Sequence, residues 1–311
     1  MDRLKTIFMG TPDFAVPCLR VLQEKTDIMA VITQPDRPKG RGHNLQASPV
    51  KQAALEYGLP VLQPEKIKTE EFTARLEEMQ PDLIVVVAFG QILSQRILDI
   101  PRLGCVNVHA SLLPRYRGAA PIHWSIINGE EETGVTTMLM DAGLDTGDML
   151  LKDKVAIPPD MTTEELHDKL MDMGGRLLSD TIDGLAAGTI VPEKQDDSLS
   201  NYARMLNKET GHIDWTKTAT EIHNLIRGLN SWPVAWGMLE GKNYKFWRTR
   251  AAEGDCSQPP GTVTELGKNS FKVATGKGLL EVLELQPPSR KRMSAGDFVR
   301  GHGVEIGAVF S

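Results

Sequence analysis

Short apolar runs alternate with amphipathic stretches over the first 189 residues. Continuously apolar runs between turn residues predict strands buried on both faces of a sheet, and apolar residues spaced three and four apart predict helices. The predicted strands are 5–9, 28–33, 83–88 and 105–109. The predicted helices are 15–24, 50–57, 69–79 and 163–184. This alternation predicts an α/β fold, with an N-terminal doubly wound, Rossmann-like domain.

The last third of the chain follows a different pattern. Residues 190–207 are polar and lack periodicity, which is typical of a linker. After a predicted helix, five strand-like segments recur between turn residues, which predicts a small antiparallel β-barrel. The helix is 219–227, and the strands are 236–239, 244–249, 262–266, 271–274 and 279–285. We therefore expect a domain over 1–189, a linker over 190–207 and a β-rich domain over 208–311.

Composition excludes several classes of protein. The chain has 311 residues, of which 41% are hydrophobic and 24% charged, as in ordinary globular proteins. The longest apolar run, 83–89, is too short to span a bilayer, and no secretion signal is apparent, so we expect a cytoplasmic protein. Cys18, Cys105 and Cys256 are far apart, which argues against a metal site or a disulfide framework.

Charge is distributed unevenly. The net charge of −6 argues against a surface that coats nucleic acid non-specifically. Residues 1–189 hold 19 basic and 27 acidic residues, whereas 190–311 hold 16 and 14. Any contact with nucleic acid must therefore be local.

Segment 105–109 (CVNVH) carries polar side chains where a buried strand should be apolar. Alternation along a strand puts Asn107 and His109 on one face and Val106 and Val108 on the other. Ligands of open α/β sheets bind outside the carboxyl ends of the strands, where this pair would lie. The pair indicates either a binding site or, equally, a buried Asn and His that stabilise a loop.

Two loops beyond this strand could complete a site. Residues 110–121 are small, turn-forming and cationic, so they form either a pocket wall or a connection to a helix with solvated arginines. Residues 140–148 join two strand-like segments and offer Asp141, Asp145 and Asp148. A carboxylate beside His109 would orient the imidazole for acid–base chemistry. The residues alone do not select among the three.

The turn at 10–14 (GTPDF) follows the first predicted strand. It lacks the G-x-G-x-x-G spacing of dinucleotide-binding loops, which disfavours a nicotinamide cofactor. We expect Thr11 or Asp13 to cap the following helix.

Positive charge gathers in two segments. Residues 34–49 form a long connection without predicted structure, which could contact a phosphate backbone or be a plain solvated loop. Against one acid, Asp36, its basic residues are Arg37, Lys39 and Arg41. In the second domain, residues 242–250 mix cations with aromatic residues, the pattern of a barrel core with one wet face.

Several motifs, taken in order, closely resemble the methionyl-tRNA formyltransferase family. They are 10–14 (GTPDF), 33–38 (TQPDRP), 107–114 (NVHASLLP), 117–121 (RGAAP), 144–148 (LDTGD), 213–215 (IDW) and 232–233 (WP). The resemblance covers essentially the whole chain and implies a formyltransferase domain followed by an OB-like domain. It also implies transfer of a formyl group from 10-formyltetrahydrofolate to the amino group of methionyl initiator tRNA, for translation initiation.

The resemblance further implies roles for particular residues. The catalytic positions match Asn107, His109 and Asp145. The expected folate contacts are Ser111, Leu112, Leu113, Pro114 and Phe89. The expected tRNA contacts are Arg37, Lys39, Arg41, Lys242 and Lys245. Where we would expect a further lysine after Arg41, this chain has His43 and Asn44. No metal is needed for this chemistry, and we expect a monomer.

Other functions are weighed against this one. A sugar-nucleotide amine formyltransferase could share the Asn, His and Asp set, but the 34–49 loop argues against it. A glycinamide ribonucleotide formyltransferase would have one domain and a glycine-rich phosphate loop after the first strand, and this chain has neither feature. A non-catalytic RNA-binding protein could use the barrel and the basic loop, and formyl transfer to any amine would exclude it.

Overall fold

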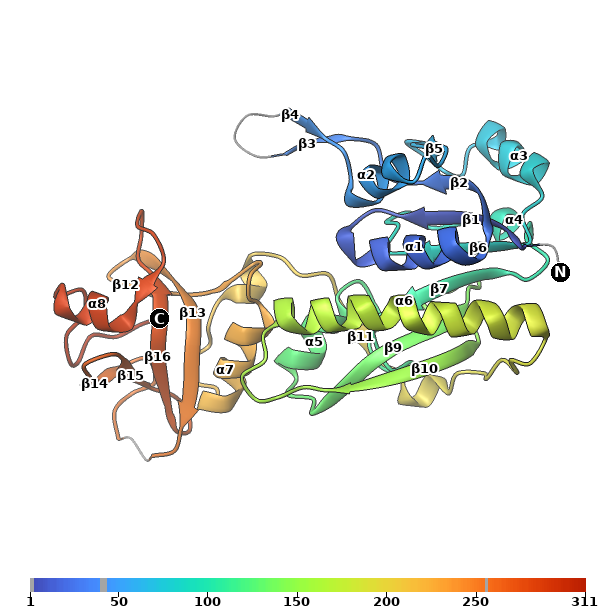
Figure 1. The fold of residues 1–311 in the computed structure, drawn as a ribbon. Helices are drawn as coiled ribbons and strands as arrows, with labels where there is room; N and C mark the ends of the chain where they lie inside the picture. Colours follow the sequence, from blue (N-terminus) through green and yellow to red (C-terminus); the bar gives the residue numbers. More distant parts are fainter. Residues whose placement is uncertain (1–2, 40–43, 255–256) are drawn as a thin grey trace. The chain divides into compact units, whose positions relative to one another are not determined.

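The computed structural model describes residues 3–39, 44–254 and 257–311 (Figure 1). Contacts between Cα atoms divide the chain into two compact units. Unit 1 comprises 1–118, 134–155 and 167–202, and unit 2 comprises 119–133, 156–166 and 203–311. The domain boundaries at 189 and 207 stay a prediction. No helix among the described residues is long and apolar enough to cross a membrane.

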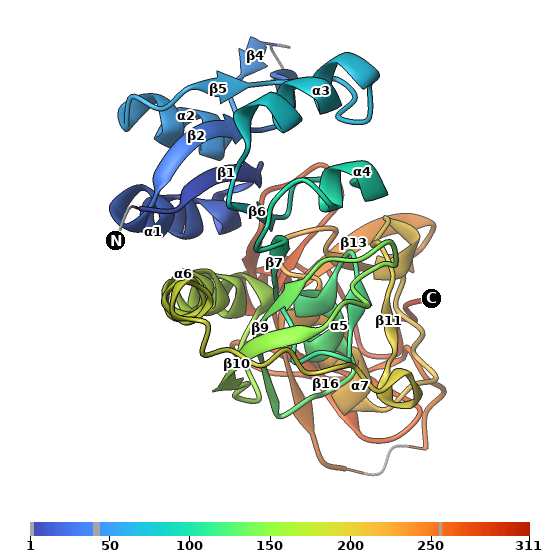
Figure 2. The ribbon, with the colours of Figure 1, turned by 90° about the vertical axis from the view of Figure 1, so that its right-hand side faces the viewer.

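A seven-stranded sheet forms the centre of unit 1 (Figure 2). Its order is β10-β9-β7-β6-β1-β2-β5. The strands are β1 (Lys5–Gly10), β2 (Asp27–Ile32), β5 (Val61–Leu62), β6 (Leu83–Val87), β7 (Cys105–His109), β9 (Glu132–Leu139) and β10 (Met149–Ala156). Strands β5, β2, β1, β6 and β7 are parallel, and β9 is antiparallel to β7. The predicted α/β fold is confirmed.

Helices cover both faces of this sheet. They are α1 (Val16–Lys25), α2 (Pro49–Glu56), α3 (Glu70–Met79), α4 (Gln95–Leu98) and α6 (Thr163–Ala187). Leu76 of α3 and Ile97 of α4 share one apolar core with Cys105 of β7. On the other face, α6 approaches so closely that a Cβ on Gly174 would lie 3.2 Å from Val108 Cγ1. Val108 therefore faces α6, and the predicted alternation along β7 is confirmed.

Unit 2 is built on an antiparallel sheet of order β12-β13-β16-β15-β14, with β17 paired to β16. The strands are β12 (Ala235–Leu239), β13 (Lys242–Ala252), β14 (Val263–Leu266), β15 (Phe271–Ala274), β16 (Leu279–Gln286) and β17 (Met293–Ser294). The last residues of the chain join its two edges. Ser311 exchanges two backbone hydrogen bonds with Met238 of β12, and Val263 of β14 donates to the carbonyl of Ala308. The ring of hydrogen bonds is thereby closed into a barrel.

Aromatic side chains fill this barrel. Phe246 of β13 and Phe310 are fully buried, with ring centroids 5.4 Å apart, and Trp215 packs against both. The helices of this unit are α5 (Pro121–Ile127), α7 (Ala219–Gly228) and α8 (Ala295–Arg300). Thr218 and Glu221 form a reciprocal capping box at the start of α7. Helices α5 and α8 were not predicted, because seven and six residues are too few to show a periodic pattern.

Segment 34–49 is not structureless, contrary to the sequence-based expectation. Strands β3 (Arg37–Lys39) and β4 (Asn44–Gln46) form an antiparallel hairpin, while residues 40–43 lie outside the described part. The hairpin escapes periodicity analysis because Leu45 is 71% exposed, so neither strand needs an alternating apolar face. The shortest elements elsewhere are β8 (Arg117–Gly118), β11 (Tyr202–Ala203) and the 3-10 helices Asp13–Ala15, Asp197–Leu199 and Glu209–Gly211.

The expected capping role of Thr11 or Asp13 is wrong. The N-cap residues of the 3-10 helix at Asp13–Ala15 and of α1 are Pro12 and Ala15, and neither makes a side-chain cap bond. Asp13 Oδ1 accepts a hydrogen bond from the main-chain N–H of the next residue, Phe14. Instead, the Thr11 hydroxyl donates to the Phe89 carbonyl and accepts from the Gln34 amide. Thr11 thus joins the segments that follow β1, β2 and β6, which is a tertiary role that local sequence does not indicate.

Candidate active site

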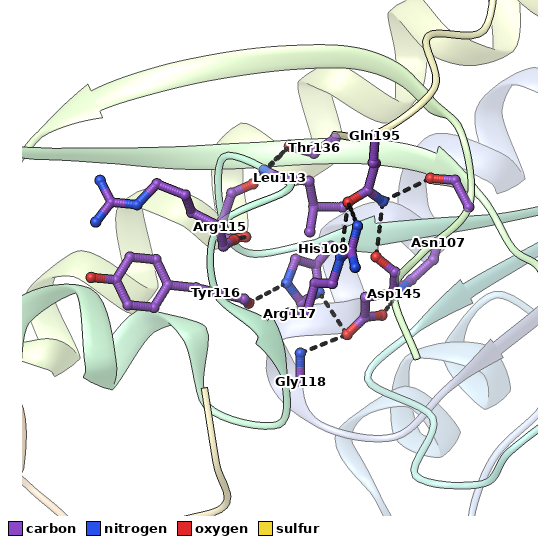
Figure 3. Close-up of polar contacts among 12 residues, drawn as sticks. Asn107, His109, Leu113, Arg115, Tyr116, Arg117, Gly118, Thr136, Asp145 and Gln195 are labelled. Carbon is purple, nitrogen blue, oxygen red and sulfur yellow. Dashed lines mark hydrogen bonds and ion pairs between the residues drawn. The ribbon is translucent and has the colours of Figure 1, made fainter. Parts of the chain in front are cut away.

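Strand β7 carries Asn107 and His109 to the carboxyl end of the sheet, between β6 and β9. The His109 side chain is 6% exposed. Its Nε2 lies 2.9 Å from the carbonyl oxygen of Tyr116 (Figure 3). A carbonyl can only accept, so we assign the hydrogen of the neutral ring to Nε2. The basic lone pair is then on Nδ1, which lies 3.7 Å from Asp145 Oδ2.

Asp145 is the carboxylate that completes the site. Its Oδ1 accepts a 3.4 Å hydrogen bond from Asn107 Nδ2, and its Oδ2 accepts a 2.8 Å bond from the Gly118 amide. Asp141 instead accepts hydrogen bonds from Gly143 and Thr146 within its own turn. The structure thus brings Asn107, His109 and Asp145 together, as the resemblance implied.

The loop after β7 is held by β9. The Thr136 hydroxyl donates to the Ser111 carbonyl and accepts from the Leu113 amide, while the Ser111 hydroxyl donates to the Arg115 carbonyl. Ser111 and Leu113 are buried, whereas Leu112 and Pro114 are partly exposed. This loop and the partly buried Asn107 follow one another on the chain, so the predicted folate contacts adjoin the reactive groups.

Phe89 lies in a different setting from the other predicted folate contacts. Its side chain is 2% exposed and packs in the core between the sheet and α3 and α4. Phe89 also lines a cavity of about 530 Å³ at the carboxyl ends of β1, β2 and β6. The cavity wall also includes Thr11, Gln34 and Arg37. Asn107 and His109 are not among the residues that line this cavity.

Sequence analysis missed Gln195 as part of the site and left the role of Arg117 open. Arg117 was expected either in a pocket wall or as a solvated residue, but it is only 9% exposed and donates two hydrogen bonds to Gln195 Oε1. Gln195 was placed in a polar linker, yet it is 7% exposed and bonds to the main chain of Asp145. A polar side chain 50 residues from its partner gives no local signal.

The predicted tRNA contacts belong to both units. Arg37 is exposed on β3, Lys39 ends that strand, and Arg41 lies outside the described residues. Lys242 and Lys245 are exposed on β13, whereas Phe246 is in the barrel core, as the wet-face pattern predicted. Within unit 1, the one acid of the hairpin segment is paired: Asp36 Oδ2 lies 2.6 Å from Lys51 Nζ.

Within the described residues, no group of three or more His, Cys, Asp or Glu side chains is arranged to hold a metal ion. Burial raises the pKa of the Cys18 and Cys105 thiols to about 12. These two cysteines are therefore poor nucleophiles. Cys256 lies outside the described residues.

Two family models match the chain. Formyl transferase matches residues 4–182, and formyl transferase, C-terminal domain, matches residues 205–303. The fold and these matches define the chain as a two-domain formyltransferase.

Curated relatives specify the family. A methionyl-tRNA formyltransferase of Clostridium perfringens is 54% identical, covering 98% of this chain and 99% of the relative. One of Trichlorobacter lovleyi is 55% identical, covering 99% and 98%. The chain belongs to the methionyl-tRNA formyltransferase family.

Solved structures share the fold at low identity. WlaRD, a sugar 3N-formyl transferase solved with dTDP and 5-N-formyl-THF, is 22% identical with a TM-score of 0.66, covering 91% of this chain and 98% of that one. HypX from Aquifex aeolicus, in complex with tetrahydrofolic acid, is 15% identical with a TM-score of 0.62, covering 96% and 47%.

The pairing of Asp36 with Lys51 gives a pH-dependent prediction. Hydrogen bonds from Lys51 and Gln63 lower the Asp36 pKa from its ordinary 3.8. Lys51→Met should raise this pKa, measured by carboxyl-carbon NMR titration, and Lys68→Met, which alters an exposed lysine elsewhere on unit 1, should not. Since the folded-state pKa is depressed, the pair stabilises the fold above the unfolded-state pKa and loses this effect as pH falls through the folded-state pKa. An unchanged Asp36 pKa in Lys51→Met would contradict the assignment.

Proposed function

We propose that this chain transfers a formyl group from 10-formyltetrahydrofolate to the α-amino group of methionine on initiator tRNA. The products are N-formylmethionyl-tRNA, for translation initiation, and tetrahydrofolate. The observation that carries the proposal is 52–55% identity, over nearly the whole chain, to relatives named methionyl-tRNA formyltransferase. The Asn107, His109 and Asp145 arrangement supports it, because it offers a hydrogen-bond donor and a proton acceptor side by side.

Asn107 stabilises the charge that develops on the formyl oxygen. The methionyl amine attacks the formyl carbon, and the carbonyl oxygen of the tetrahedral intermediate becomes an oxyanion. The amide nitrogen of Asn107 has two N–H donors, and its bond to Asp145 occupies one. The other donates to the oxyanion, and a donor fixed in this way needs little reorganisation during the reaction.

His109 accepts and donates protons during the reaction, and Asp145 stabilises its protonated form. The attacking amine loses one proton, and N10 of the folate gains one when the carbon–nitrogen bond breaks. With Nε2–H bonded to the Tyr116 carbonyl, the imidazole accepts a proton at Nδ1, facing Asp145 Oδ2. The carboxylate stabilises the resulting imidazolium, whose charge in turn favours the neighbouring oxyanion.

The substrate contacts form two sets in this proposal. Ser111, Leu112, Leu113, Pro114 and Phe89 contact the folate. Two structural neighbours were solved with folates, WlaRD with 5-N-formyl-THF and HypX with tetrahydrofolic acid. The acceptor end of the tRNA passes Arg37, Lys39 and Arg41, and Arg37 borders the cavity beside β6. Lys242 and Lys245 contact the tRNA elsewhere along its backbone.

The proposal also assigns the parts of the chain. Residues 1–189 form the catalytic domain, 190–207 the linker and 208–311 the OB-like tRNA-binding domain. The enzyme acts in the cytoplasm as a monomer and uses no metal. Light scattering of the purified protein tests the monomer, and activity after exhaustive chelation tests the absence of a metal requirement.

A formylation assay tests the proposed function directly. The protein is incubated with 10-formyltetrahydrofolate and either methionyl initiator tRNA or an amino-sugar nucleotide. We expect N-formylmethionine on the tRNA and no formylated sugar. Formyl transfer to the sugar alone would reverse the substrate assignment, and no transfer to either acceptor would favour a non-catalytic RNA-binding protein.

The roles of Asn107 and His109 predict the size of the kinetic defects. Removing one oxyanion donor costs about 10²–10³ in kcat, and removing a general acid or base costs about 10²–10⁴. Asn107→Ala and His109→Ala should show such losses in single-turnover measurements while still binding folate by calorimetry. Asp153→Asn, which alters an exposed carboxylate on β10, serves as control. Near wild-type turnover in either alanine variant would refute that residue's role.

The two tRNA contact surfaces should separate by mutation. Arg41→Ala should raise KM for methionyl-tRNA and leave folate binding unchanged, because phosphate contacts position the acceptor end. Replacing Lys242 and Lys245 with Ala should flatten the salt dependence of tRNA binding, by a slope of about 0.7–0.9 per lost contact. Lys66→Ala, at an exposed site on unit 1, is the control. Unchanged tRNA kinetics in Arg41→Ala would move recognition away from the hairpin.

A further inference from the structure

Gln195 joins two segments that meet at Asp145. Its Nε2 donates to the carbonyl oxygens of Asp145 at 2.9 Å and Gly147 at 2.7 Å (Figure 3). Its Oε1 accepts from Arg117 Nε at 3.0 Å and from a terminal guanidinium nitrogen of Arg117 at 2.9 Å. Both amide hydrogens and both oxygen lone pairs are therefore used, at a residue that is 7% exposed.

The partners fix the orientation of this amide. Two carbonyl oxygens can only accept, and a guanidinium can only donate. A flipped amide would place its nitrogen against Arg117 and its oxygen against the two carbonyls, losing every bond. Gln195 therefore holds one orientation of its amide.

The turn that Gln195 binds needs support. Asp145 has φ +54°, a left-handed conformation that costs energy for a residue other than glycine. Two residues later, a Cβ on Gly147 would lie 1.8 Å from the carbonyl oxygen of Leu139, so the turn sits directly on β9. Two hydrogen bonds from one buried side chain hold the main chain in this conformation.

Arg117 connects the turn to Gly118, whose N–H donates to the Asp145 carboxylate. The residue after Arg117 is Gly118, whose N–H binds Asp145 Oδ2. Gln195 thus fixes the main chain of Asp145 directly, and through Arg117 it steadies the strand that binds the Asp145 side chain. The carboxylate is held from both ends, 3.7 Å from His109 Nδ1.

We propose that Gln195 is a positioning residue that keeps Asp145 in reach of His109 and Asn107. None of the hydrogen bonds of Gln195 reaches the His109 ring or the Asn107 amide, so it acts through the 145–147 turn. The proposal rests on the proposed function, in which Asp145 supports the imidazolium. Because a displacement of about 1 Å in a catalytic group can cost about a hundredfold in rate, loosening this turn should lower kcat rather than substrate affinity.

A matched control lies on the same arginine. Arg117 also donates to Asp197 Oδ1 at 2.7 Å, and the Asp197 side chain is 83% exposed. Exposed ion pairs contribute little to stability. Asp197→Asn changes the solvent side of Arg117 and leaves its bonds to Gln195 intact, so its kcat should match the wild type.

The experiment compares Gln195→Ala, Gln195→Glu and Asp197→Asn, each alone and combined with Asp145→Asn. Gln195→Glu still accepts from Arg117 but cannot donate to the two carbonyls. We measure kcat, KM for both substrates and thermal midpoints. Both Gln195 variants should lose about 10–100-fold in kcat with KM within about twofold. In the Asp145→Asn background, the same replacements should cost little more.

Other results would overturn the inference. Unchanged kcat, or an equal loss with and without the Asp145 carboxylate, would mean that Gln195 serves packing alone. If Gln195→Ala does not fold, Gln195→Glu carries the same comparison.

A measurement that does not depend on enzyme activity separates this inference from the proposed function. Hydrogen exchange at the Gly118 amide should be faster in the Gln195 variants than in the wild type or Asp197→Asn, and unchanged exchange would refute the positioning role of Gln195. A wild type that formylates no tRNA would refute the proposed function, while the exchange result would still decide whether Gln195 fixes the turn.

Discussion

The site depends on one largely buried carboxylate, Asp145, that hydrogen bonds hold in place. The Asp145 side chain is 12% exposed, and a buried charge is costly unless donors replace the water it loses. The Gly118 amide and Asn107 Nδ2 supply two donors, and the imidazole of His109 faces the remaining side. These groups come from β8 and β7. The carboxylate therefore gains its protein donors only when unit 1 has folded.

The features that could be predicted from the sequence are those that a local pattern of residues determines. Strand β7 has the predicted bounds because alternation and the flanking turns are visible within a few residues. The same alternation put Asn107 and His109 on one face, which the structure confirms. Choosing Asp145 among three carboxylates needed the family resemblance, because the choice depends on Gly118 and His109, which lie 27 and 36 residues away along the chain.

What the sequence could not predict is determined by distant partners. The sequence predicts Thr11 as a helix cap, but its hydroxyl donates to the Phe89 carbonyl, 78 residues away. The sequence predicts Gln195 as part of a linker, although partners in two other segments take up all the hydrogen bonds of its side-chain amide. The terminal residues 308–311 carry no strand signal, yet they close the barrel because the edges of β12 and β14 offer unpaired backbone groups.

Electrostatics explains why the hairpin can be basic within an acidic part of the chain. Residues 1–189 carry a net charge of −8, which would repel a phosphate backbone unless local cations offset it. Asp36 lies at the base of the hairpin, and its charge is offset by Lys51 of α2, which also holds the pKa of Asp36 down. Arg37 keeps its side chain exposed. The charge of Asp36 is therefore offset from α2, by Lys51, while the neighbouring Arg37 stays exposed.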